Sequence, residues 1–357
     1  MRIVLTGGGS GGHVFPNFAI LPLLLRRAEV FYIGEKGKLE EKLSAENNLP
    51  FYPLTAPKLV RGKFICNLSI PQKLLKSVSD AKRALKEISP AVVFSKGGYV
   101  ALPVSMAANS LGIPLVFHES DISMGLANKL CLPFASKVLT SFNYDNPKYI
   151  TTCSPVREEI LLAKREKLFD NAFPDLLILG GSLGASELND FAFENKDALA
   201  EKFNVILVTG KDKNRYGKKA DNSLGKKENN LSKTSTSRRG GFFVTEFAEN
   251  VGRLFASADV CISRGGSGTL FELALKKLPS LIVPLKCASR GEQVKNAEYF
   301  ERAGIFAVHK EGANILDEVE AVYKNRARYK ENMKNSPFSD GKERIVEEIF
   351  ASVKIDD

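Results

Sequence analysis

The sequence predicts an α/β protein made of two doubly wound, Rossmann-like domains. Short apolar runs of buried-strand type alternate with segments of helical composition along most of the chain, a pattern typical of a parallel sheet covered by helices on both faces. Glycine-rich turns follow several of these runs. The chain has 357 residues, which is more than one hydrophobic core usually accommodates, so two domains are expected.

The first half of the chain opens on its alternation of strands and helices at once. Residues 2–6 (RIVLT) are expected to form a strand that leads into a glycine loop at 7–12. A helix is predicted at 73–88, because Ser89-Pro90 would end it there. The remaining elements expected in this half are strands at 30–34, 91–95 and 113–120 and a helix at 103–112.

The alternation pauses near 153–157 (CSPVR), and we place the domain boundary there, giving domains at 1–156 and 157–339. Strands of the second domain are expected at 175–181, 204–210, 242–247, 258–266 and 280–285. The last segment, 340–357, should form an amphipathic helix that packs back on the first domain. Its apolar face consists of Ile345, Val346, Ile349, Phe350 and Val353.

The composition is that of a globular protein from a reducing compartment. Apolar residues make up 44% and charged residues 26% of the chain, both ordinary values. The five cysteines are far apart and odd in number, which indicates neither a disulfide framework nor a zinc cluster. No signal peptide is visible, and the longest strongly apolar run, 18–25, is far too short to span a bilayer.

Two basic patches explain the net charge of +10. Residues 58–86 and 211–239 each carry a net charge of +7, so the rest of the chain is net acidic. No zinc-finger spacing or RNP-like aromatic motif accompanies them, which argues against nucleic acid as a partner. The second patch is rich in Lys, Asn and Ser, and its neighbourhood, 211–240, is expected to be a mobile loop.

Residues 263–296 contain the most informative glycine turn. Gly265, Gly266 and Gly268 precede a segment of helical composition, and a helix N-terminus offers free amides to an anion. Glu272 lies where its carboxylate could bind ribose hydroxyls, as in nucleotide-binding folds. An alternative interpretation needs no ligand, because Thr269-Leu-Phe-Glu272 also fits a capping box.

The first glycine loop allows a second class of function. Gly7, Gly9 and Gly12 satisfy G-x-G-x-x-G, and Glu35 follows the second predicted strand, about where a dinucleotide fold places its ribose-binding acid. An NAD(P)-dependent oxidoreductase is therefore one alternative. It would leave the third glycine turn, near Ser182, without a role.

Seven motifs together resemble the MurG family of glycosyltransferases and span nearly the whole chain in the same order. They are GGGSGGHVFP, KGGYVALP, FHESDISMGLANK, SPVR, GGSLGA, VTEF, and SGTLFELA followed by EQVKNA. The resemblance implies a GT-B fold, with two Rossmann-like domains facing a cleft, and inverting transfer of N-acetylglucosamine (GlcNAc) from UDP-GlcNAc. The acceptor would be the N-acetylmuramic acid (MurNAc) C4 hydroxyl of undecaprenyl-linked lipid I, and the product lipid II for peptidoglycan synthesis. Another GT-B sugar-nucleotide transferase is the closer alternative.

The resemblance also implies the residues of the site. The second domain would bind UDP-GlcNAc, with Glu272 on the ribose and Gln293 on the sugar, and Asn128 would also contact the sugar. Glu292 and the Gly265–Ser267 segment depart from the common family pattern. The implied substrate-binding residues are Ser10, Gly11, Gly12, Asn128, Arg157, Ser182, Ala248, Ser267, Gly268, Thr269, Leu270, Phe271, Glu272 and Gln293.

The acceptor hydroxyl needs a general base. His13, at the tip of the first glycine loop, is the first candidate, and Glu119 or His118 is the second. Once the resemblance is considered, Glu35 is interpreted as a solvated turn residue. No D-x-D motif is present, so we expect no metal ion and no other cofactor, with glycine-turn amides binding the diphosphate instead.

A lipid-linked acceptor stays in the bilayer, so the enzyme must come to it. The resemblance implies a peripheral protein at the cytoplasmic face of the bacterial inner membrane. Residues 58–86 mix basic side chains with apolar ones such as Phe64 and Ile65, which suits an anionic membrane surface. Residues 211–239 contain few apolar side chains and are not expected to dock. The alternative interpretation of 58–86 is a solvated helix face.

Overall fold

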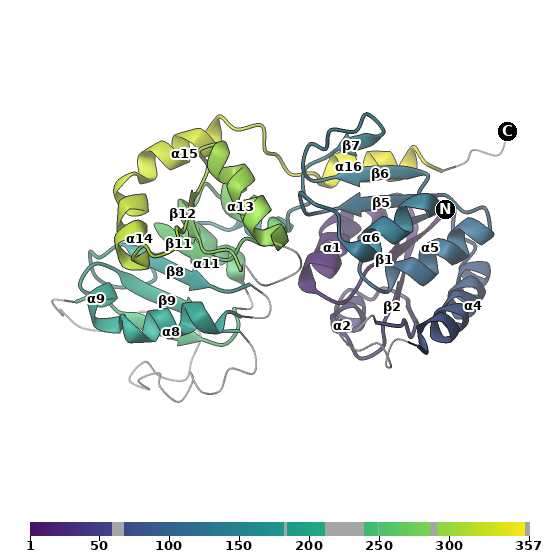
Figure 1. The fold of residues 1–357 in the computed structure, drawn as a ribbon, viewed down its shortest axis with the longest axis horizontal. Coiled ribbons are helices and arrows are strands. Elements are labelled where there is room, and N and C mark those ends of the chain that lie inside the picture. Colours follow the sequence, from purple (N-terminus) through teal and green to yellow (C-terminus); the bar gives the residue numbers. More distant parts are fainter. Residues whose placement is uncertain (59–67, 182–183, 211–238, 249, 286–290, 354–357) are drawn as a thin grey trace. The chain divides into compact units, whose positions relative to one another are not determined.

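The computed structural model of the chain (Figure 1) consists of two compact units. Unit 1 comprises Met1–Arg157 and Ser339–Asp357, and unit 2 comprises Glu158–Phe338. The structure describes all residues except 59–67, 182–183, 211–238, 249, 286–290 and 354–357. The predicted mobile loop at 211–240 therefore lies almost entirely outside the described residues, as do Phe64 and Ile65.

Unit 1 is built on a parallel sheet. Its strands follow the order β3-β2-β1-β4-β5-β6-β7 within the described residues, and every neighbouring pair is parallel. The central strands are buried over most of their length, as apolar runs in a two-sided sheet must be. The strands are β1 (Arg2–Thr6), β2 (Glu29–Gly34), β3 (Phe51–Pro53), β4 (Val92–Ser95), β5 (Leu115–Glu119), β6 (Lys137–Thr140) and β7 (Tyr149–Thr151).

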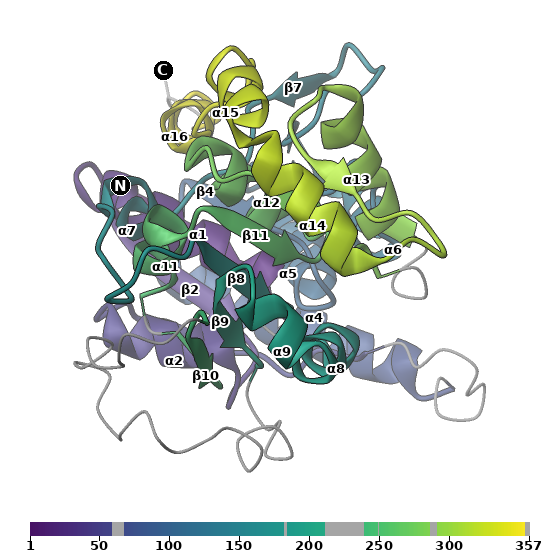
Figure 2. The same cartoon turned by 90° about the vertical axis from the view of Figure 1, so that its left-hand side faces the viewer.

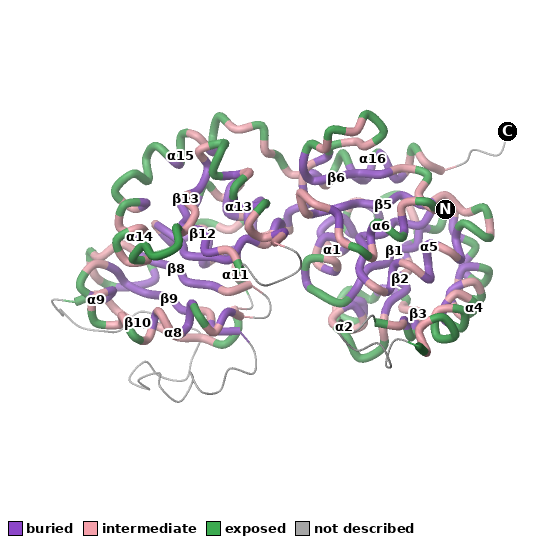
Figure 3. The backbone as a smooth tube through the Cα atoms, in the orientation of Figure 1, coloured by how far each residue is buried: buried purple, intermediate pink, exposed green. Residues whose placement is uncertain are grey.

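Helices cover both faces of this sheet (Figure 3 shows the buried strands between them). One core cluster joins the sheet to α1 and α16, through residues such as Ile20 and Ile349. A second cluster joins it to α4 and α5, through residues such as Leu85 and Val104. The helices of unit 1 are α1 (Gly11–Leu25), α2 (Leu39–Glu46), α4 (Ile70–Ile88), α5 (Ala101–Ser110), α6 (Leu126–Cys131) and α16 (Lys342–Phe350), with a 3₁₀ turn at Leu132–Phe134.

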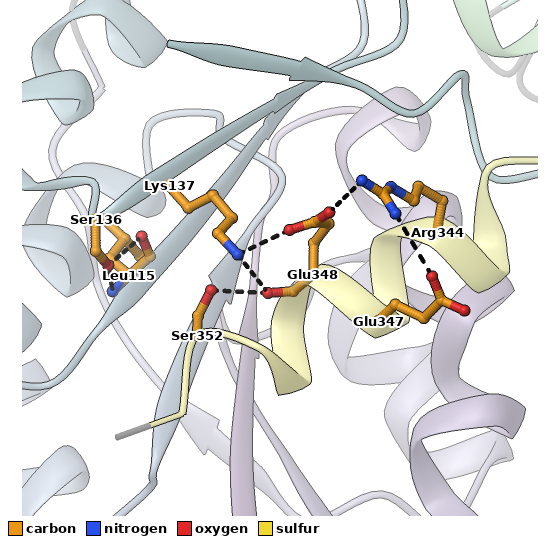
Figure 4. Close-up of polar contacts among 7 residues, drawn as sticks. All are labelled: Leu115, Ser136, Lys137, Arg344, Glu347, Glu348 and Ser352. Carbon is orange, nitrogen blue, oxygen red and sulfur yellow. Dashed lines mark hydrogen bonds and ion pairs between the residues drawn. The ribbon is translucent and has the colours of Figure 1, made fainter. Parts of the chain in front are cut away.

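The C-terminal helix α16 belongs to unit 1 although 181 residues separate it from the rest of that unit. Ile345, Val346 and Ile349 are buried in the same cluster as α1. Lys137 Nζ lies 2.7 Å from Glu348 Oε2. The same carboxylate forms a second ion pair with Arg344, also at 2.7 Å (Figure 4). Apolar burial therefore holds the helix, and Lys137 pairs with it at the amino end of β6.

Unit 2 repeats the doubly wound pattern with the strand order β10-β9-β8-β11-β12-β13 in its described part. Figure 2 shows α8 and α9 together at one side of this sheet and α11 at the other. The strands are β8 (Asp175–Leu179), β9 (Asn204–Val208), β10 (Phe242–Thr245), β11 (Val260–Ser263), β12 (Ser280–Ile282) and β13 (Ala307–Val308). The helices are α7 (Glu158–Leu162), α8 (Ser186–Glu194), α9 (Lys196–Ala200), α11 (Val251–Ser257), α12 (Ser267–Leu275), α13 (Glu292–Arg302), α14 (Ile315–Lys324) and α15 (Arg326–Lys334).

Each sheet has one switch point, which is the place where the strand order reverses direction. In unit 1 it lies between β1 and β4, and in unit 2 between β8 and β11. Loops that leave the carboxyl ends of the two strands diverge there, which opens a crevice where ligands bind in folds of this kind. The glycine turns singled out in the sequence follow these four strands. The fold therefore predicts one candidate site in each unit.

Candidate functional site

His13 lies in the first turn of α1, directly after the glycine loop that follows β1. Its Nδ1 is 3.2 Å from the carbonyl oxygen of Gly8 and 3.3 Å from Ser10 Oγ. Because a carbonyl oxygen can only accept, Nδ1 carries the ring proton and Nε2 keeps its lone pair. Burial lowers the pKa of His13, and the charge of Lys96 lowers it further, against an opposing effect of Asp121. The residue is thus a neutral imidazole in the tautomer that a general base requires.

The second glycine turn of unit 1 packs directly on the first. Gly98 has φ +85°, and a Cβ there would lie 2.1 Å from the carbonyl oxygen of Gly8. The Gly8 amide donates to the carbonyl of Gly97 at 3.4 Å. Only glycine fits this backbone approach. The loop that orients His13 is therefore held by the turn after β4.

Asn128 connects this turn to Glu119 at the end of β5. Its Oδ1 accepts from the amide of Gly98 at 3.3 Å, and its Nδ2 donates to Glu119 Oε2 at 2.7 Å. Glu119 Oε1 accepts from the amide of Asp121 at 3.0 Å. Asn128 is only 4% exposed and Glu119 only 2%. Burial, followed by the charge of Asp121, raises the pKa of Glu119. Both predicted site residues therefore lie close to His13's loop, and both are bonded within the protein.

His118 is fully buried, and both of its ring nitrogens have protein partners. Its Nε2 lies 3.3 Å from the carbonyl of Cys153, so Nε2 carries the proton. Its Nδ1 accepts from Lys96 Nζ. Burial and then the charge of Lys96 hold the pKa of His118 well below its usual value. The hypothesis that His118 could be the base is therefore wrong, because no lone pair remains to receive a proton.

Glu35 also differs from its expected role as a solvated turn residue. It is half-buried, and one carboxylate oxygen accepts a hydrogen bond from the Tyr99 hydroxyl. Its amide donates to the buried carboxylate of Glu40 at 3.2 Å. Glu35 therefore helps to hold Tyr99, the residue that follows the second glycine turn.

The predicted substrate-binding residues Ser10, Gly11 and Gly12 lie at the start of α1. Gly11 is buried, and the other two are exposed.

Arg157 closes the first segment of unit 1. Its guanidinium lies over the ring of Phe15 at 4.9 Å from the centroid, a typical cation–π distance. Phe15 is in α1, two residues after His13. The structure thus places Arg157 beside the helix that carries the candidate base.

In unit 2, α12 begins at Ser267, with Gly266 as its N-cap and without a side-chain cap hydrogen bond. Thr269 is therefore the third residue of the helix and cannot be its N-cap, so the capping-box interpretation of Thr269 and Glu272 is wrong. The amide of Leu270 already bonds to the Gly266 carbonyl at 3.1 Å. The amides at 267–269 precede it in the first helical turn, where intrahelical acceptors are missing.

The rest of the predicted segment divides between core and surface. Leu270 and Phe271 are completely buried, and the Phe271 ring packs edge-to-face with Phe300 and Phe338 at 5.3 and 5.7 Å. Glu272 is half-buried on the same helix. The side chains at 270 and 271 therefore stabilise the fold, while Glu272 remains the candidate for a ribose contact.

Gln293 lies in the first turn of α13, beside the turn after β11. Its Oε1 accepts from the amide of Leu285 at 3.1 Å, and a Cβ on Gly265 would be 2.4 Å from its carbonyl oxygen. Asn296 Nδ2 donates to the carbonyl of Gly265 at 3.2 Å. Helix α13 therefore supports the glycine turn that begins α12, and Gln293 is held next to it.

Arg264 is a residue of this turn that received no role from the sequence. It is 7% exposed and donates to the carbonyl of Val283 at 2.9 Å and to Glu187 Oε2 at 2.7 Å. It joins the ends of β11 and β12 to α8, so its role is to stabilise the packing of these three elements. Only its position directly before a glycine turn could have indicated this.

Two predicted substrate-binding residues of unit 2 remain. Ala248 is half-buried shortly after β10, and Ser182 lies outside the described residues.

Three further observations concern the described part of the chain. Within the described residues, no cluster of His, Cys, Asp and Glu side chains is arranged to hold a metal ion. The same part of the chain contains no helix long and apolar enough to cross a membrane. A cavity of about 470 Å³ in unit 2 is lined by residues such as Asp175 and Asp259, which precede or begin β8 and β11. It lies at the amino ends of the strands, away from the switch point.

Comparison with known proteins follows the same division into two halves. The glycosyltransferase family 28 N-terminal domain matches residues 3–140, and the family's C-terminal domain matches residues 175–349. The UDP-N-acetylglucosamine–N-acetylmuramyl-(pentapeptide) pyrophosphoryl-undecaprenol N-acetylglucosamine transferase of Clostridium tetani is 36% identical, over 97% of this chain and 96% of its own. The protein of the same name from Lachnoclostridium phytofermentans is 38% identical, over 97% of each chain.

Solved structures agree on the fold. Acinetobacter baumannii MurG superposes with a TM-score of 0.75 at 24% identity, covering 98% of this chain and 99% of its own. The kitacinnamycin glycosyltransferase superposes with a TM-score of 0.68 at 14% identity, covering 99% of each chain. The predicted GT-B fold, with two doubly wound domains, is confirmed.

Proposed function

The chain belongs to glycosyltransferase family 28, and on that premise we propose that it transfers GlcNAc from UDP-GlcNAc to the C4 hydroxyl of MurNAc in lipid I, giving lipid II. The observation that supports this most is the identity of 36–38% over nearly the full length of transferases named for that reaction. Natural-product glycosyltransferases share the fold at far lower identity, so they support the class of reaction but not another acceptor.

Unit 2 is proposed to bind the donor. The first amides of α12, at 267–269, would receive the diphosphate, because a helix N-terminus combines unpaired donors with a favourable dipole. Glu272, one turn further along, would accept hydrogen bonds from the ribose. Gln293 would contact the GlcNAc hydroxyls from the adjacent turn of α13. The charge that develops on the leaving diphosphate would then be stabilised by fixed dipoles rather than by a metal ion.

Unit 1 is proposed to supply the base. In the transition state the C4 oxygen bonds to C1 of GlcNAc, the C1–diphosphate bond breaks on the opposite face, and the configuration inverts. The hydroxyl proton moves to Nε2 of His13, which is free to accept it because Nδ1 is held by Gly8. Glu119 is 2% exposed and both of its oxygens accept hydrogen bonds. We therefore assign it to support of Asn128 rather than to proton transfer.

We also propose that the protein reaches lipid I as a peripheral protein on an anionic membrane surface at the cytoplasmic face. Helix α4 buries Ala81 and Leu85 in unit 1, while Leu68 just before it and Leu75 within it are 77% and 68% exposed. Lys73 and Lys76 are exposed next to them. Exposed leucines among lysines match the two contributions to interfacial binding, apolar insertion and attraction to anionic lipid.

Liposome flotation tests this surface. The double variant Leu68→Ser, Leu75→Ser should float less with anionic vesicles and lose activity on bilayer-embedded lipid I, while its affinity for UDP stays unchanged. Leu162→Ser is the matched control, because Leu162 is a leucine of unit 2 with 68% exposure. Normal flotation of the double variant would contradict the assignment.

The reaction itself is tested by incubating the protein with labelled UDP-GlcNAc and lipid I and identifying the lipid product. Lipid II with a β-linked GlcNAc is expected, and UDP-glucose should be a poorer donor. If the protein transfers GlcNAc to another hydroxyl acceptor and not to lipid I, the proposed acceptor is wrong. Tight binding of NADH without UDP binding would support an oxidoreductase instead.

A further inference from the structure

Lys96 is a buried amine to which the proposed mechanism gives no role. It follows β4 directly and is only 1% exposed. Its Nζ donates to Ser120 Oγ at 2.6 Å and to His118 Nδ1. A Cβ on Gly7 would lie 3.2 Å from the Cβ of Lys96. The side chain therefore runs beneath the first glycine loop, from the end of β4 to the end of β5.

The partners of this amine are unusual for a buried lysine. An imidazole and a hydroxyl accept its hydrogen bonds, and no ion pair joins it to a carboxylate among the described residues. Burial lowers the pKa of Lys96, while Glu119 and Asp121 raise it. Burying an amine costs free energy. A methionine, which is nearly as long, would fill most of the same space without that cost, which argues for a functional requirement.

The two partners flank Glu119. In an extended strand, residues i and i+2 point to one side and residue i+1 to the other. Lys96 therefore holds His118 and Ser120 on one side, while Glu119 points away from it to Asn128. Asn128 in turn accepts from the Gly98 amide, and Gly98 packs on Gly8, whose carbonyl orients His13.

We propose that Lys96 is a positioning residue for the transfer reaction, holding the end of β5 so that the chain of contacts from Glu119 through Asn128 and Gly98 orients His13. The predicted effect on kcat rests on the proposed function, because it is measured with lipid I. The contacts themselves are independent of any substrate. Lys96 touches neither a reacting atom nor solvent, so its effect must pass through these neighbours.

The proposal has an electrostatic consequence that a purely structural role would not have. The positive charge of Lys96 lowers the pKa of both His13 and Glu119. Asp121 also acts on His13, in the opposite direction. If Lys96 becomes neutral, the pKa of His13 must rise, because its protonated form loses a repulsive neighbour. The base is then protonated at a higher pH, so the acid limb of the activity profile moves upward.

NMR titration of histidine labelled at Cε1 measures this consequence without any activity assay. The chain has three histidines, which are His13, His118 and His309. In Lys96→Met, the midpoint of His13 should move to higher pH. An unchanged His13 midpoint in the folded variant would overturn the proposal.

Kinetics on lipid I provide the second readout. Lys96→Met should lower kcat about 10- to 100-fold, the scale of a small misplacement of a reacting group, with little change in UDP affinity. Lys137→Met is the matched control, since it removes a lysine of unit 1 that pairs with Glu348. It should lower thermal stability without moving the acid limb. A wild-type kcat in Lys96→Met would overturn the proposal.

A milder substitution covers the case in which Lys96→Met does not fold. Ser120→Ala removes one contact of Lys96 and keeps its charge, so kcat should fall while the acid limb stays in place. Wild-type kcat in Ser120→Ala would refute positioning through Ser120. Failure of wild-type protein to form lipid II would refute the proposed function instead, and the His13 titration would still test Lys96.

Discussion

The switch points of the two sheets are built from different chemical groups, side chains in unit 1 and main-chain amides in unit 2. In unit 1, polar side chains have protein partners: His13 bonds to the first glycine loop, Lys96 bonds to Ser120, and Asn128 bonds to Glu119. The two backbone turns also touch. In unit 2, the corresponding position is a helix N-terminus whose first amides have no intrahelical acceptors, next to Gly266 and Gly268, where an added Cβ would meet nothing within 4 Å.

This difference fits the division of roles that we propose for the two units, a base in unit 1 and donor binding in unit 2. A titratable group must be held in one tautomer, which requires partners on several sides, so the unit 1 site is crowded. A nucleotide diphosphate needs donors at fixed positions and space to enter, so the unit 2 site has main-chain amides and small residues. Similar topology therefore permits a site for a base in one unit and for a donor in the other.

The same substitution in the two turns should give opposite results. Gly98→Ala places a Cβ 2.1 Å from a backbone oxygen at φ +85°, so it should cost about 3 kcal/mol of unfolding free energy and abolish activity. Gly268→Ala lies inside α12 with open space around it and should stabilise the helix by up to about 1 kcal/mol. Its cost should appear in UDP affinity. Chemical denaturation and calorimetric UDP titration measure both. A well-folded, active Gly98→Ala protein would contradict the account of the crowded site.

Loss of His13, the proposed base, should affect turnover alone. His13→Asn removes the Nε2 lone pair, and we expect turnover to fall about 100-fold or more, the usual scale for a general base. UDP affinity should stay near the wild-type value, because the donor contacts are proposed to lie in unit 2. His309→Asn is the control for a histidine outside the site. Near-wild-type turnover in His13→Asn would remove His13 from the mechanism.

Loss of Glu272, the proposed ribose contact, should affect UDP binding. Glu272→Ala should weaken UDP binding by about 1–3 kcal/mol, the range for a hydrogen bond to a charged group. Thermal denaturation of the same variant checks that the fold is kept. Glu301→Ala, an exposed glutamate of α13, serves as the control. Unaltered UDP affinity would move the ribose contact elsewhere.

The smallest expected effect concerns metal. If the amides of α12 stabilise the diphosphate, a chelator such as EDTA should leave turnover unchanged. The measurement compares initial rates with chelator, and with chelator followed by excess magnesium. A rate that disappears and then returns with magnesium would show that dipoles alone do not serve the leaving group.

The sequence predicted most interior strands and the edge strand β10, but it missed the interior strand β6 and the edge strands β3, β7 and β13. β1, β4, β5 and β8 are buried on both faces, so they appear as continuous apolar runs. β3, β7 and β13 contain two or three residues and are mostly half-buried, which leaves no run to recognise. Their pairing is decided by neighbours that are distant in the sequence.

The candidate site shows the same limit. Glycine turns are visible in the sequence because their composition is local, and they led to His13 and to the start of α12. The contacts of Lys96 with His118 and Ser120 join residues 22 and 24 positions apart. No local pattern reveals that the lysine is buried, or that His118 has no free nitrogen. The capping-box interpretation failed because the helix begins two residues before Thr269.

The central claim is that the two switch points act on different steps, and a double-variant cycle tests it most directly. The measurement is kcat/KM for lipid II formation in wild type, His13→Asn, Glu272→Ala and the double variant. Independent sites should give free-energy losses that add within about 0.5 kcal/mol. A double variant no worse than the poorer single variant would show that both residues act on one step, and would contradict the division of roles.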